Sequence, residues 1–83
     1  MPNGNQIMFV IIEGSYPTER EAKESMRKIT KSNKINEEPW IMEGRTGRPM
    51  VALFETRDGK VAEKKVMEYF YKGIITAIWR DKL

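Results

Sequence analysis

The side chains that most often carry out catalysis or bind transition metals are missing from this chain. Its 83 residues include no cysteine and no histidine, so disulfides, thiolate zinc sites and a histidine general base are excluded. Ser15, Ser25 and Ser32 are available as nucleophiles, but the sequence offers none of them a convincing base. Glu13 is the carboxylate best placed for proton transfer, and a position at the rim of a sheet explains it more simply. We therefore predict that the protein is not an enzyme.

The acidic and basic residues set limits on the ligands of the protein. Its 12 acidic residues are scattered and lack the spacing of a calcium-binding loop. We therefore expect no metal site, and no cofactor. The 15 basic residues give a net charge of +3, which permits an acidic partner without requiring one.

Two groups of basic side chains suit contacts with phosphates. Arg45 and Arg48 lie in a predicted loop, and a second group lies toward the end of the predicted first helix: Arg27, Lys28, Lys31 and Lys34. A basic edge formed by these groups would bind the backbone of a nucleic acid. Nucleic-acid binding is our alternative prediction, and a solvated polar face is the simpler interpretation.

The first half of the chain predicts a strand followed by a helix. Residues 7–12 are rich in β-branched side chains and apolar on both faces, as in a central strand. Thr18 and Glu21 have the spacing of a capping box at the start of a helix. The apolar stripe of this helix recurs at steps of four and three, and the helix should fade near residues 30–33; the stripe comprises Ala22, Met26 and Ile29.

The second half predicts a hairpin, a helix and a last strand. Strands at 40–43 and 50–55 flank a loop at 44–49 that contains two glycines. Asp58 caps a second helix, Gly73 ends it, and residues 74–79 form the last strand. The buried face of this helix is predicted to comprise Ala62, Val66, Tyr69 and Phe70, and Met67 is also placed in the core. We expect loose tails at 1–6 and 81–83.

The order strand, helix, strand, strand, helix, strand predicts an α+β ferredoxin-like (βαββαβ) sandwich. In this fold, a four-stranded antiparallel sheet carries both helices on one face. Residues 1–83 are expected to form a single domain. The first apolar run is too short to span a bilayer and no basic residue precedes it, so we expect no membrane span and a cytoplasmic location.

The other face of the predicted sheet would be open to a partner. Because successive strand residues point to opposite faces, we assign the faces by assuming that no charged residue lies under the helices. The predicted open face then comprises Phe9, Ile11, Ile41, Val51, Leu53 and Ile78. The predicted core comprises the alternate residues Met8, Val10, Ile12, Trp40, Met42, Met50, Ala52, Phe54, Ile75, Ala77 and Trp79.

An apolar open face with a charged rim indicates a surface for binding. We predict a small non-catalytic interaction or regulatory module that self-associates or binds a protein partner through this face. RNA recognition by the sheet is disfavoured, because Glu13, Glu43 and Glu55 would repel phosphates. An accessory protein of a virus or phage would have such a sequence, as would many bacterial or archaeal proteins.

One segment resembles a known family. Gly14, Ser15 and Tyr16 follow an apolar strand, and Ala22 lies inside the next helix. This resembles the start of SPOR domains, in which a strand ends in Gly-Ser-Phe and an alanine follows in the first helix. The resemblance implies the same fold and a third function, the binding of peptidoglycan strands stripped of their peptides.

Overall fold

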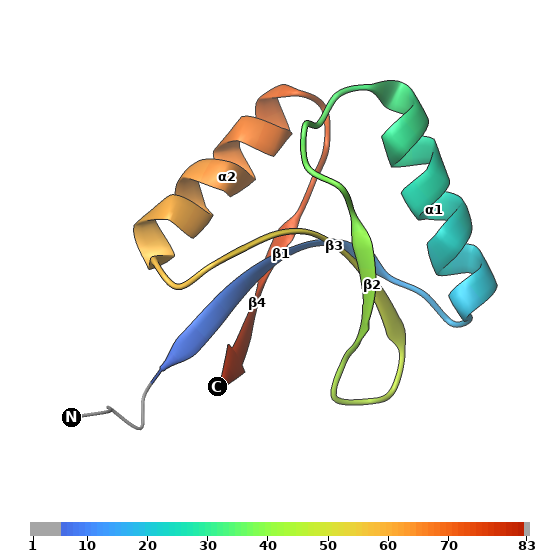
Figure 1. The fold of residues 1–83 in the computed structure, drawn as a ribbon, viewed down its shortest axis with the longest axis horizontal. Helices are drawn as coiled ribbons and strands as arrows, with labels where there is room; N and C mark the ends of the chain where they lie inside the picture. The colour runs from blue at the N-terminus through green and yellow to red at the C-terminus, as the bar shows by residue number, and fades with distance from the viewer. Residues whose placement is uncertain (1–5, 83) are drawn as a thin grey trace.

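The structure is a computed structural model that describes residues 6–82. Within them the chain forms β1 (Ile7–Ser15), α1 (Glu19–Ser32), β2 (Trp40–Glu43), β3 (Pro49–Thr56), α2 (Gly59–Tyr71) and β4 (Ala77–Lys82). The four strands make one antiparallel sheet in the order β2-β3-β1-β4. Both helices lie on one side of this sheet (Figure 1). The predicted α+β ferredoxin-like fold is confirmed.

The ends of two strands differ from the prediction. β1 continues to Ser15 instead of ending at Ile12, because an irregularity in its pairing with β3 accommodates Glu13. β4 begins at Ala77, since Ile74 still belongs to the cap of α2. The predicted tail at 81–83 is wrong for Asp81 and Lys82, which pair with β1. Of the predicted tail at 1–6, only Gln6 lies within the described residues, and it is exposed and outside the strand.

The helices begin and end as the sequence indicates. The Thr18 hydroxyl accepts a hydrogen bond from the Glu21 amide at 3.2 Å, which satisfies one free donor of the first turn of α1. Asn33 ends α1 in the left-handed conformation. At the end of α2, the amide of Gly73 donates to the Phe70 carbonyl and that of Ile74 to the Tyr69 carbonyl. This is a Schellman motif, and Gly73 suits it because φ there is 86°.

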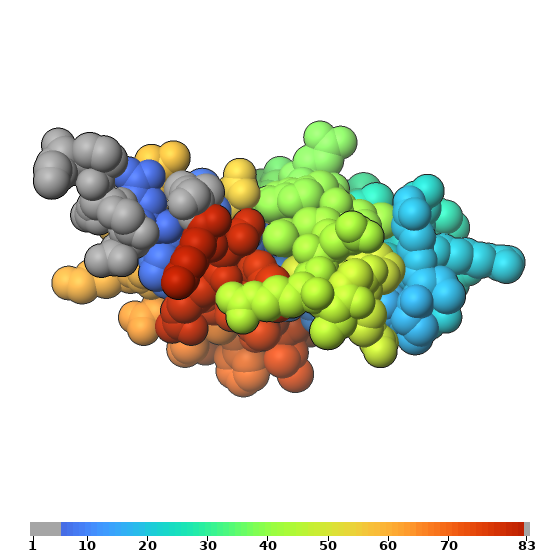
Figure 2. Space-filling view, turned by 90° about the horizontal axis from the view of Figure 1, so that it is seen from below, coloured from blue at the N-terminus to red at the C-terminus, as the bar shows by residue number. Residues whose placement is uncertain are grey.

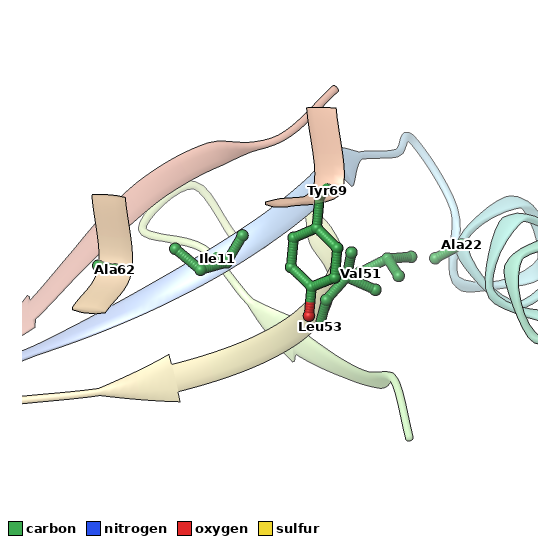
Figure 3. Packing of buried hydrophobic residues seen from close by; sticks show 6 residues of the cluster. All are labelled: Ile11, Ala22, Val51, Leu53, Ala62 and Tyr69. Carbon is green, nitrogen blue, oxygen red and sulfur yellow. The ribbon is translucent and has the colours of Figure 1, made fainter. Parts of the chain in front are cut away.

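The core lies between the sheet and the helices. Its fully buried side chains come from four elements and comprise Ile11, Ala22, Val51, Leu53, Ala62 and Tyr69. Figure 3 shows the Tyr69 ring beside Val51 and Leu53, with Ala62 and Ala22 at the two ends of the cluster. Small alanines on the helices let α1 and α2 approach the strands closely, and the large side chains of the sheet and Tyr69 fill the space.

The two helices diverge, and the segment between α1 and β2 runs between them (Figure 1). This connector, residues 33–39, contributes Ile35 to the core. It also contributes Glu37, whose carboxylate accepts hydrogen bonds from the Lys65 ammonium at 2.6 Å and the Tyr69 hydroxyl at 2.8 Å. The connector therefore fills the space between the helices and is fixed to α2.

Candidate functional site

The predicted open face is wrong: the structure places these residues beneath the helices. Ile11, Val51 and Leu53 are each 0% exposed and pack against helix residues in the core. The other three members of the set, Phe9, Ile41 and Ile78, are partly buried and pack against the same cluster. None of these six residues is available to a partner on the open face.

Glu13 is the first cause of this error. Its side chain points to the same face of the sheet as those of Phe9 and Ile11, as predicted. This face, however, is the one that the helices cover. The Tyr16 hydroxyl donates to the Glu13 carboxylate at 2.7 and 2.8 Å, and the Ser25 hydroxyl of α1 donates to it at 3.0 Å. A carboxylate can lie under a helix when it is hydrogen-bonded in this way, so charge did not identify the open face.

An irregular pairing is the second cause. Between β1 and β3 the register shifts twice: Ile11 pairs with Phe54, but Ile12 pairs with Ala52. Leu53 is the extra residue, so Phe54 and Leu53 both pack toward the core while Glu55 points away. Strict alternation from Glu55 therefore predicts the wrong face of the sheet for Leu53 and Val51.

The open face consists of most of the residues that were predicted as core. Cross-strand pairs on it include Val10 with Trp79, Ile12 with Ala77 and Trp40 with Ala52. Met42 pairs with Met50 on the same face. Val10, Met50 and Ala52 are buried although no helix covers them, and both tryptophans are half-buried. This face is thus an apolar layer whose outer strands carry one tryptophan each.

The β2–β3 hairpin reaches across this face. The Arg45 guanidinium carbon lies 5.4 Å from the centroid of the Trp79 ring, a cation–π contact between the hairpin and β4. Figure 2, seen from below Figure 1, shows the hairpin and β4 side by side. A flexible arginine thus covers an amphipathic ring that a partner would contact, and this is the feature that most resembles a binding site.

The structure does not bring the two groups of basic residues together. Arg27, Lys28 and Lys31 share a hollow on the last half of α1, and Lys34 lies beside Gly73 at the end of α2. The hairpin with Arg45 and Arg48 instead lies near the start of α1, where Glu19 shares a hollow with Gly47 and Pro49. The two groups thus lie toward opposite ends of α1.

Two polar clusters lie between the helices and the sheet. Burial raises the pKa of Tyr16, the Ser25 hydrogen bond lowers it, and Glu13 raises it by hydrogen bond and charge, so that the net shift is upward. In the second cluster, burial opposes ionisation of Glu37 and Lys65. Their mutual hydrogen bond, with help from Tyr69 and Glu68, outweighs burial, so that the pKa of Glu37 is lowered and that of Lys65 is raised. Both clusters connect elements: the first joins β1 to α1, and the second joins the connector to α2.

The sequence also missed a second apolar surface, on α2. Phe70 and Met67, predicted as buried, are 56% and 48% exposed. Nearby Tyr71 and Ile75 are 79% and 77% exposed. The helical period places Phe70 about 80° from the buried residue Ala62, at the edge of the buried face, which explains the error.

In residues 6–82, no cluster of acidic side chains has the arrangement of a metal site, and no helix is long and apolar enough to span a membrane. Comparison of the chain with protein-family models, curated proteins and solved structures found no match.

Proposed function

We propose that the protein is a non-catalytic interaction module that binds a protein partner on the open face of its sheet. The observation that carries this proposal is the stacking of Arg45 on Trp79 above an apolar layer. Tryptophan, methionine and arginine are enriched at protein interfaces, and tryptophan and arginine dominate the residues whose loss weakens binding most.

The dimensions of the face favour a helical partner. The outer strands β2 and β4 of a four-stranded sheet lie about 14 Å apart, and an α-helix with side chains is about 10–12 Å across. One amphipathic helix therefore fits between Trp40 and Trp79. Arg45 and the neighbouring Arg48 favour acidic residues beside the apolar stripe of that helix.

Selection from a displayed library of amphipathic helical peptides tests this proposal. We expect the selected peptides to be acidic, to change the tryptophan fluorescence, and to bind Trp79→Ala at least about tenfold more weakly than the unchanged chain. Tyr71→Ala is the matched control, since Tyr71 is an exposed aromatic residue on α2, away from the open face. Peptides that bind Trp79→Ala with unchanged affinity would reject the proposal.

A glycan strand is the second candidate ligand. Ser15, from the segment that resembles SPOR domains, is exposed and pairs with Met50 at the end of the same face. Tryptophan rings also stack on sugars. If the library yields no binding peptide, and the chain instead binds peptide-free peptidoglycan strands in a way that Trp79→Ala abolishes, the partner would be a glycan and not a protein. Binding of single-stranded oligonucleotides that weakens steeply with salt would instead support nucleic acid.

A further inference from the structure

The two edges of the sheet differ in how open they are. The edge strand β2 has four residues and follows Pro39. The edge strand β4 has six residues, contains no proline or glycine, and pairs with β1 without a register shift. A regular edge strand presents unpaired backbone donors and acceptors, which a further strand can use.

Exposed apolar side chains lie on the outer part of α2 and just before β4. The Phe70 and Tyr71 rings are in edge-to-face contact with centroids 6.1 Å apart, and Met67 and Tyr71 line one shallow hollow. Glu63, two turns before Phe70 on α2, shares a hollow with Ile78 of β4. Phe70 therefore lies on the β4 side of α2. The exposed residue Ile75 lies two positions before the strand begins at Ala77.

We propose that β4 and this flank of α2 form an interface with a second copy of the chain. A two-fold axis would pair β4 with β4 of the other copy in antiparallel orientation, which gives a continuous eight-stranded sheet. An extended peptide would satisfy the strand edge but leave Phe70 and Ile75 exposed. A second copy has a strand and an apolar helix flank at the same distance from each other, so it covers both the β4 edge and the apolar flank of α2.

The surface area that would be buried and the charges around the patch agree with a second copy of the chain as the partner. Covering the exposed parts of Met67, Phe70 and Ile75 in two copies removes roughly 700 Å² of surface. The paired strands add to this, which brings the interface into the range of about 1,200–2,000 Å² for specific complexes. Positive and negative side chains both border the patch, so a second copy would not face a surface of like charge. These side chains are Lys60, Lys64, Glu63 and Glu68.

Mass measurement over a concentration series, by light scattering after size-exclusion chromatography, tests this interface. We expect a monomer–dimer equilibrium whose dissociation constant rises at least about tenfold in Phe70→Glu and in Ile75→Glu. Both residues are more than half exposed, so the monomer should still fold, which circular dichroism checks. Val61→Glu is the control, because Val61 is exposed and lies nine positions, or half a turn in phase, from Phe70.

Several results would overturn the proposal. A wild-type monomer at millimolar concentration would do so, as would a dimer that survives Phe70→Glu and Ile75→Glu. Loss of the dimer in Trp40→Ala alone would assign self-association to the open face. The interface leaves Trp40 and Arg45 uncovered, so the dimer and the proposed function can fail independently.

Amide hydrogen exchange locates the contact directly. We expect protection at residues 77–82 to increase with protein concentration, while protection at residues 40–43 stays constant. An increase at β2, or at neither strand, would contradict pairing through β4.

Discussion

At the scale of single residues, Glu13 shows how a charged side chain is accommodated under a helix. Its carboxylate accepts a bifurcated hydrogen bond from the Tyr16 hydroxyl and a second hydrogen bond from the Ser25 hydroxyl. The Tyr16 hydroxyl also lies 2.8 Å from the Ser25 oxygen. This cluster ties the end of β1 to α1, so it should contribute to stability.

Tyr16→Phe should therefore destabilise the fold. The substitution keeps the ring and removes the bifurcated hydrogen bond of the Tyr16 hydroxyl to a partly buried carboxylate, which should lower the free energy of unfolding by about 1–2 kcal/mol. Urea denaturation measures this difference. Tyr71→Phe, at an exposed position, should change stability by less than about 0.5 kcal/mol. Equal stability of the two variants would show that water replaces the Tyr16 hydroxyl at no cost.

The cluster of Glu37, Lys65 and Tyr69 should make stability depend on pH at both extremes. The pKa of Glu37 is lowered in the folded state, so its stabilising effect is present above the unfolded value of about 4.3 and is lost as pH falls through the folded pKa. Burial, together with hydrogen bonding and charge from Glu37, raises the pKa of Tyr69, and that of Lys65 is also raised. Their effect is present below about pH 10 and is lost as pH rises further.

Urea denaturation across pH tests this assignment with two variants. Glu37→Gln should reduce the loss of stability at acid pH, and Tyr69→Phe should reduce the loss at alkaline pH. Acid and alkaline profiles that keep the wild-type shape in both variants would assign the dependence to other groups.

At the scale of elements, the face of each strand is the feature that a substitution can test. Leu53→Ala should cost about 2–5 kcal/mol, because Leu53 is fully buried in the core. Met42→Ala should cost less than about 2 kcal/mol, because Met42 is half-buried on the open face. Thermal or urea unfolding of both variants gives the comparison. A larger loss for Met42→Ala would restore the face assignment made from the sequence.

The sequence predicted the elements because their signals are local. The Thr18 cap, the Gly73 cap and the apolar stripe of α1 depend on neighbours within a turn or two, and all three are confirmed. The extra residues Glu13 and Leu53 depend on pairing between distant strands, so no local pattern marks them. One extra residue reverses the face of every residue beyond it.

The sequence predicted that the sheet has an apolar open face, but the residues assigned to that face were wrong. An apolar open face was expected and exists, yet the residues assigned to it lie beneath the helices, and most of those assigned to the core form it. β1 and β3 are apolar on both faces, so alternation could not distinguish the two sides. Arg45 was singled out for its charge, whereas its contact with Trp79 depends on how the hairpin folds over the sheet.

At the scale of the whole molecule, the two helices are held in different ways. α1 has one fully buried residue, Ala22, and α2 has two, Ala62 and Tyr69. α2 is also joined to the connector through Glu37, and it packs on three strands, β1, β3 and β4. Because the helices diverge, with the connector between them, each must derive most of its stability from the sheet beneath it.

We therefore expect α1 to open more easily than α2. Native-state hydrogen exchange should give lower opening free energies for amides of α1 than for those of α2, since local stability follows the amount of buried contact. Tyr69→Phe should lower the values for α2, because it removes the hydrogen bond to Glu37, and should leave the opening free energies of α1 nearly unchanged. If both helices instead exchange with one free energy equal to that of global unfolding, the sheet and the two helices form one cooperative unit, and the connector joins them more strongly than their separate contacts indicate.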